Sequence, residues 1–131
     1  MDWKSEYSLG IPKVDDEHAK FLRLISNIES AIDLNVGPQI VLIALAQLKS
    51  FAKEHFESEE VVMRIHRYAR TAEHTEAHRN FIQQLEELEQ RTLNNLLGRE
   101  SMLVYLRDWF TQHLFGADRE FAQAMLQARQ G

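Results

Sequence analysis

Apolar residues recur at intervals of three and four along most of this chain, which is the period of an amphipathic α-helix. Short stretches with glycine, proline or asparagine interrupt the pattern. We therefore expect four helices, near residues 15–34, 38–67, 71–97 and from 99–101 onward, the last continuing beyond a disturbance at Gly116. Residues 1–14 lack this period, and Gly10 and Pro12 disfavour a helix there. They predict an extended arm whose aromatic side chains pack on the helices.

Four helices with short connections predict an all-α fold, an up-down-up-down four-helix bundle with an extended N-terminal arm. Asp15 and Asp16 are expected to cap the first helix. No segment shows the pattern of a β-strand. With 131 residues the chain can bury one proper core. We expect a single domain over 1–131, with the arm at 1–14 and the bundle at 15–131.

Polar residues of metal-ligand type interrupt the apolar stripes of two helices. The inward stripe of the second helix holds Val41, Leu45, Leu48, Ala52, His55, Glu59, Val62 and Met63. His74 and His78 open the stripe of the third. Residues four apart on an α-helix lie within about 40° of each other, so each pair shares a face. Buried imidazoles and carboxylates are costly unless something satisfies them.

The up-down topology brings these positions to one end of the bundle. His18 lies early in the first helix, His55 late in the second, His74 early in the third and His113 late in the fourth. Each inward histidine alone has a common alternative as a hydrogen-bonded core residue. Five imidazoles and a carboxylate at one level favour a bound cation. His66 is left over and is expected to be exposed.

Asp118 is a further candidate ligand, five residues after His113. That spacing is about 140° apart on a straight α-helix, which separates the two side chains. A π-type bulge or a break near Gly116 would restore a shared face, and such bulges are frequent at functional sites. Alternatively, Asp118 pairs with Arg119 or caps a final helix.

Composition narrows the chemistry. The chain has no cysteine, so a metal site must use nitrogen and oxygen ligands. A net charge of −5 disfavours nucleic acid and anionic membranes as partners. No segment looks like a signal peptide or a membrane span. We expect a cytoplasmic protein without membrane insertion, and the Met1 start and the well-formed arm favour a complete chain.

Four separated motifs carry a family resemblance over essentially the whole chain. They are His18, His55-Phe56-x-x-Glu59-Glu60, His74-x-x-x-His78 and His113-x-x-x-x-Asp118, preceded by Trp3, Tyr7, Gly10-Ile11 and Val14-Asp15-x-x-His18. The set resembles the hemerythrins, specifically the single-domain bacterial hemerythrins. Departures are Ala69 where a proline is common, Val14 where isoleucine is frequent, and Phe110 where a smaller aliphatic residue often lines the oxygen pocket.

The resemblance implies a non-haem di-iron site with an oxo or hydroxo bridge and dioxygen as its ligand. In it, His74, His78 and His113 would bind one iron, His18 and His55 the other, and Glu59 and Asp118 would bridge both. One coordination position would stay open on the iron with two histidines, for dioxygen. We expect Phe56, Trp109, Phe110 and Leu114 to line the oxygen pocket. We expect Glu60 to make mainly a solvated ion pair, and the alternative is that it supports a metal ligand from outside the site.

The ligand balance favours binding over catalysis. Oxygen-activating di-iron bundles use mostly carboxylate ligands, whereas this set is mostly imidazole. We therefore expect a non-enzymatic protein that binds dioxygen reversibly for storage, delivery or sensing, as a monomer, with an unidentified protein as a possible recipient. The alternatives are a di-iron enzyme acting on peroxide or nitric oxide or in iron-centre repair, and a structural metal bundle. Zinc-hydrolase spacing is absent, because Glu76 comes one place late after His74.

Overall fold

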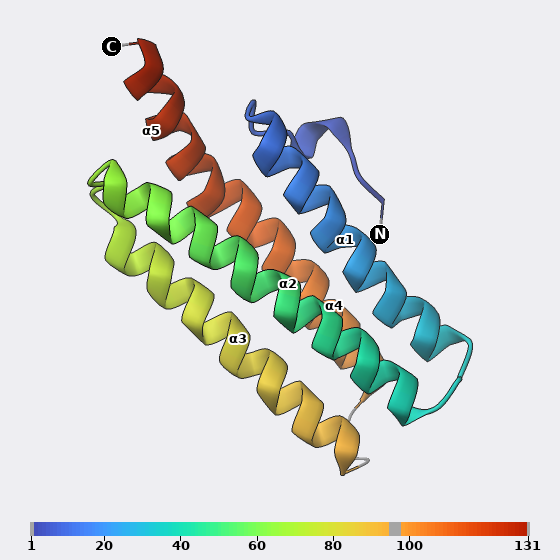
Figure 1. Cartoon of the computed structure of the whole chain (residues 1–131). Helices are drawn as coiled ribbons and strands as arrows, with labels where there is room; N and C mark the ends of the chain where they lie inside the picture. The colour runs from blue at the N-terminus through green and yellow to red at the C-terminus, as the bar shows by residue number, and fades with distance from the viewer. Residues whose placement is uncertain (1, 95–97, 131) are drawn as a thin grey trace.

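Long helical rods lie side by side, with their connections at alternate ends (Figure 1). The computed structural model describes residues 2–94 and 98–130. Its elements are the 3-10 turn η1 (Ser5–Tyr7), α1 (Pro12–Asp33), α2 (Pro38–Ile65), α3 (Thr71–Leu93), α4 (Arg99–His113), the π-helix η2 (Leu114–Asp118) and α5 (Arg119–Gln130). The last three follow one another without a break and form the fourth rod. The described residues contain no strand, and the predicted up-down four-helix bundle is confirmed.

The first helix begins earlier than expected. Pro12 is its first residue, where the missing N–H of proline costs nothing and its fixed φ suits a helix. Asp15 therefore lies inside α1 and does not cap it. Its carboxylate instead accepts hydrogen bonds from the Leu9 N–H at 2.8 Å and the Ser8 hydroxyl at 2.6 Å. These bonds tie the arm to the helix.

The N-terminal arm packs through its aromatic residues. Tyr7 is buried and makes an edge-to-face contact with Phe110, with ring centroids 6.0 Å apart. Trp3 packs edge-on against Tyr7 at 5.6 Å. The arm thereby covers α1 and the fourth rod close to the polar end of the core.

Two helix ends also differ from the sequence-based bounds. α2 ends at Ile65, two residues before the predicted end. α3 ends at Leu93 with Asn94 as its C-cap, and the rest of its predicted extension, residues 95–97, lies outside the described residues. Val62 is not part of the inward stripe of α2, because 38% of it is exposed.

An aromatic layer fills the middle of the bundle. Phe81 stacks on Trp109 with centroids 3.9 Å apart, and Phe21 contacts both rings. Phe56 joins the layer from α2 and stacks on His78 at 3.8 Å. The layer therefore separates an ordinary aliphatic core at one end from a histidine-rich core at the other.

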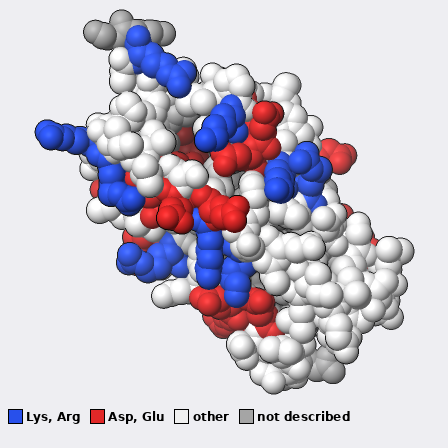
Figure 2. Space-filling model, viewed as in Figure 1, with Lys and Arg blue, Asp and Glu red and all other residues white. Residues whose placement is uncertain are grey.

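The two ends of the bundle also differ in the charge of the visible surface. Charged side chains crowd the end of the bundle near the α2–α3 turn, while the end near the α1–α2 turn is largely uncharged (Figure 2). Exposed apolar side chains at that second end include Leu34, Val36, Ile40 and Ile43. Among the described residues, no helix is both long enough and apolar enough to cross a membrane.

Candidate metal centre

Seven buried side chains from all four rods meet at the charged end of the bundle. They are His18 from α1, His55 and Glu59 from α2, His74 and His78 from α3, His113 from α4 and Asp118 from η2. None is more than 9% exposed. The structure thus brings together all seven residues that the sequence suggested as ligands. It leaves His66 exposed, as expected.

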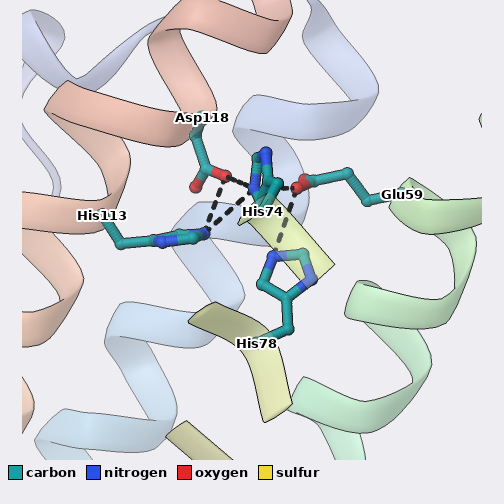
Figure 3. Close-up of side chains that lie close together, drawn as sticks. All are labelled: Glu59, His74, His78, His113 and Asp118. Atoms are coloured by element: carbon teal, nitrogen blue, oxygen red, sulfur yellow. Dashed lines mark hydrogen bonds and ion pairs between the residues drawn. The ribbon is translucent and has the colours of Figure 1, made fainter. Parts of the chain in front are cut away.

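One group of five centres on His74 (Figure 3). The Nε2 atom of His74 lies 2.8 Å from Glu59 Oε1, 3.0 Å from Asp118 Oδ1 and 3.2 Å from His113 Nε2. His78 Nε2 lies 3.4 Å from the same Glu59 oxygen, and His113 Nε2 lies 3.0 Å from the same Asp118 oxygen. Three imidazoles and one oxygen of each carboxylate therefore face a common point.

A second group lies on the other side of the two carboxylates. His18, His55 and Glu59 form it, and Glu59 Oε2 lies 3.5 Å from His55 Nε2. The second oxygen of Asp118, Oδ2, is 3.4 Å from His18 Nε2. Each carboxylate therefore turns one oxygen to the three-histidine group and the other to the two-histidine group.

The π-helix explains how Asp118 reaches this cluster. In a π-helix each N–H bonds to the carbonyl five residues back. The side chains of residues five apart therefore project from nearly the same face of the helix. η2 spans Leu114–Asp118 and follows His113 directly. The bulge expected near Gly116 is confirmed, and the alternatives in which Asp118 pairs with Arg119 or caps a helix are wrong.

The hydrogen bonding of the cluster is incomplete without a cation. A neutral imidazole carries one N–H, and the bond of His78 Nδ1 to Glu60 occupies it there. The Nε2 lone pair of His78 then faces the Glu59 carboxylate, which also only accepts. Buried atoms without a hydrogen-bond partner include both ring nitrogens of His18, His74 Nδ1 and His78 Nε2.

The spacing of these atoms also suits a metal ion. Two donors at right angles around a metal, each bonded at about 2.1 Å, lie about 3 Å apart. The contacts within the five-residue group range from 2.8 to 3.4 Å. The residues therefore fit a metal in donor type, burial and spacing, and their number exceeds the four ligands of a closed zinc site.

Electrostatics hold both carboxylates in their charged form. Burial opposes the charge of Asp118, but His113, His74 and His18 outweigh burial and hold the pKa of this carboxyl well below its usual range. Burial and the charge of Asp118 act to raise the pKa of Glu59, but the pKa is lowered overall, with the hydrogen bond from His74 as the largest opposing effect. Two negative donors are therefore available to a cation near neutral pH.

The pKa values of His74 and His18 are shifted in opposite directions. Burial lowers the pKa of His74, but the carboxylates of Asp118 and Glu59 outweigh it and raise the pKa to about 9. Burial dominates at His18 and lowers its pKa, with a partial offset from Asp118. Without a metal, His74 therefore holds a proton between the two carboxylates. A metal would take the place of that proton.

Two outer carboxylates contact the ring nitrogens that face away from the cluster. Glu60 Oε2 accepts from His78 Nδ1 at 2.8 Å, so the expectation of a mainly solvated role for Glu60 is wrong. Glu17 Oε1 lies 3.5 Å from His55 Nδ1 and was not singled out in the sequence. Carboxylates in this position fix the tautomer and orientation of metal-binding histidines.

Replacement of Glu60 tests this arrangement. Glu60→Gln removes the charge that orients His78, and it should weaken metal binding by about 10- to 100-fold, the usual loss for an outer partner of a ligand. Competition with a chelator measures the change. The matched control is Glu57→Gln, which alters an exposed carboxylate on the same helix. Equal affinities of the two variants would show that Glu60 does not position His78.

A small internal cavity adjoins the two-histidine group. It has a volume of about 10 Å³ and is lined by His18, Phe21, His55, Phe56, Trp109, Phe110, His113 and Asp118. This space is about one water molecule in size. Phe56, Trp109 and Phe110 line it as the sequence suggested, whereas Leu114 is buried but is not part of its lining. Phe21, which the sequence did not single out, completes its wall.

A four-helix bundle with an internal cluster of imidazoles and carboxylates defines a class of helical metal-binding proteins. Within that class, a family model described as "Hemerythrin HHE cation binding domain" matches residues 9–125. The chain belongs to the hemerythrin family.

The relatives span almost the same length as this chain. A bacteriohemerythrin of Clostridium acetobutylicum is 26% identical over 125 residues, which cover 91% of this chain and 96% of the relative. A hemerythrin-like protein of Naegleria gruberi is 24% identical over 121 residues, which cover 92% of this chain and 90% of the relative. The crystal structure of a wild-type hemerythrin superposes with a TM-score of 0.83 at 21% identity, covering 94% of this chain and 95% of that one. At that identity the superposition shows the shared fold.

Proposed function

We propose that this protein binds dioxygen reversibly at a di-iron centre, for storage, delivery or sensing. His74, His78 and His113 would hold one iron, His18 and His55 the other, and Glu59 and Asp118 would bridge the pair. A pair of ferrous ions supplies the two electrons that reversible oxygen binding needs. The proposal includes a single-domain, cytoplasmic monomer that exchanges oxygen with an unidentified protein recipient.

The proposal rests on one observation: each of the two carboxylates turns one oxygen to the three-histidine group and the other to the two-histidine group. Glu59 Oε1 faces His74 and His78, while Oε2 faces His55. Asp118 divides in the same way between His113 and His18. A carboxylate that offers one oxygen to each of two imidazole groups suits a pair of ions bridged by that carboxylate. A single closed ion site would leave the second group without a role.

The cavity supports a small gaseous ligand on the two-histidine side. Its lining includes both histidines of the two-histidine group, His18 and His55, but only His113 of the three-histidine group, and its volume of about 10 Å³ admits one small molecule. Phe21, Phe56 and Phe110 supply apolar walls that exclude bulk water. Exclusion of water protects a bound ligand from proton transfer and loss.

The residues favour binding over turnover of an organic substrate. Five imidazoles and two carboxylates make a mostly neutral donor set, in contrast to the carboxylate-rich sites of oxygen-activating bundles. This donor set suits a ligand that enters and leaves unchanged.

Oxygen titration tests the proposal directly. The protein should contain two iron ions per chain by metal analysis. After anaerobic reduction, added oxygen should produce a visible absorption band that saturates at one molecule per pair of irons and disappears reversibly under vacuum. Ferrous irons bridged within one dry site give this behaviour because both electrons are available at the same place.

Other outcomes separate the competing functions. A band that decays within seconds to an oxidised form unable to bind oxygen again would favour sensing or chemistry with peroxide or nitric oxide. Recovery of the protein with zinc alone, and no band after iron loading, would contradict the proposal and favour a structural metal site.

A further inference from the structure

A second and much larger pocket lies on the outer side of the histidine-rich core. It has a volume of about 390 Å³, and residues of α1, α2 and α5 line it together with Ile11 and His66. These parts of the three helices lie at the end of the bundle that holds the α2–α3 turn (Figure 1). This volume lies within the range of small-molecule binding sites. The pocket differs from the small internal cavity in position and lining, and His55 is the only residue that the two share.

We propose that this pocket binds a small amphipathic carboxylate, with its apolar body against the helical walls and its carboxylate near Lys13 and Arg129. The proposal concerns a ligand site separate from the oxygen-binding cavity. It does not depend on the identity of the metal.

The interior of the pocket is mainly apolar. Ile11 and Val14 of the α1 region, Val62 of α2, and Phe121 and Met125 of α5 line it. Phe121 is buried, and Val14 and Met125 are partly buried, so these side chains form the inner walls. An apolar body placed there is removed from water, which stabilises binding in proportion to the area covered.

The two basic side chains that line the pocket, Lys13 and Arg129, are available to a ligand, whereas its carboxylates are engaged with histidines. Lys13 and Arg129 both line the pocket and are exposed, and neither makes an ion pair with another described residue. Lys13 lies close enough to Glu17 to lower the pKa of that carboxyl, but the two side chains do not form an ion pair. Two positively charged side chains therefore remain available in a chain with a net charge of −5.

The carboxylates of the pocket are turned toward the histidines. Glu59 is buried, and both of its oxygens face imidazoles. Glu17 lies against His55 at 3.5 Å. A ligand therefore meets apolar walls and available cations, and this arrangement is complementary to an apolar body with one negative group.

Calorimetric titration of the purified protein with octanoate tests the proposal. Acetate carries the charge without the apolar body, and 1-octanol carries the body without the charge. Octanoate should bind with a stoichiometry of one, acetate should not bind detectably, and octanol should bind more weakly. Lys13→Glu should weaken octanoate binding by roughly threefold to tenfold, the range for removing and reversing an exposed ion pair. Lys53→Glu, an exposed charge reversal outside the pocket, should leave it unchanged.

A matched pair of variants locates the bound ligand. Val61 and Val62 are neighbours on α2 with 39% and 38% exposure, but only Val62 lines the pocket. Val62→Trp should fill the pocket and abolish octanoate binding, while Val61→Trp should retain it. Circular dichroism verifies that both variants stay folded.

Three results would overturn the proposal: no octanoate binding, equal binding of octanoate and octanol, or binding that survives Val62→Trp. Binding of acetate with the same affinity would also overturn it, because that result indicates direct metal ligation. The iron content and the oxygen spectrum are measured separately, so a failure here leaves the proposed oxygen binding intact.

Discussion

The His74→Ala variant is expected to bind no iron at either position. His74 Nε2 lies at the centre of the cluster, 2.8 Å from Glu59 Oε1 and 3.0 Å from Asp118 Oδ1. Its removal takes away a proposed ligand, which is also the imidazole that Glu59 and Asp118 both contact. The loss should exceed the roughly 10- to 100-fold drop that follows removal of an outer partner. Metal analysis after reconstitution, together with the visible spectrum, measures the effect.

The matched control is His66→Ala. His66 is exposed on the C-cap of α2 and is not part of the cluster. This variant should keep the iron content and spectrum of the unaltered protein. If His66→Ala lost iron while His74→Ala kept it, the assignment of the six histidines would be wrong.

The Phe81→Ala variant is expected to lose about 3–5 kcal/mol of unfolding free energy, the usual cost of removing a buried phenylalanine ring. Phe81 is fully buried and stacks on Trp109 at 3.9 Å. Phe21 and Phe56 also contact its ring. Since the aromatic layer supports the histidine-rich core, the cavity left behind cannot close without moving these neighbours. Thermal unfolding should show a midpoint lower by about 10–20 °C for a domain of this size.

The corresponding control is Val104→Ala on α4. Val104 is 54% exposed, so its replacement should change the unfolding free energy by no more than about 0.5 kcal/mol. A loss below about 1 kcal/mol for Phe81→Ala would mean that the aromatic layer relaxes into the space, contrary to the close packing of protein interiors.

The sequence and the structure agree most closely where the signal lies within one helix. The pairs His55 with Glu59 and His74 with His78 are four residues apart, and this spacing alone places each pair on one face. The apolar period and the short connections likewise determined the helix number and the antiparallel order. In that order, the starts of the first and third helices and the ends of the second and fourth helices lie at the same end of the bundle. The histidines occupy these parts of the helices, so the order also predicted that they would meet.

The structure departs from the sequence-based expectations where a side chain depends on another helix. The helical period assigns Glu60 to the outward face of α2, yet α3 brings His78 within 2.8 Å of it. Glu17 reaches His55 across the α1–α2 interface in the same way. Neither contact leaves a periodic signal, because the rotation of one helix relative to the next depends on how the complete core packs.

The position of Asp118 depends both on its spacing in the sequence and on the packing of the helices. The sequence determined that it lies five residues after His113 and that a regular α-helix would separate the two side chains. Only the tertiary structure decided between a π-helix, an ion pair with Arg119 and a helix cap. The i,i+5 turn is locally less stable than an α-turn, and it is adopted where contacts from other helices, here with His18 and His74, make up the difference. Local spacing thus determined which residues were available to the site, and the packing of the four rods decided which atoms face one another.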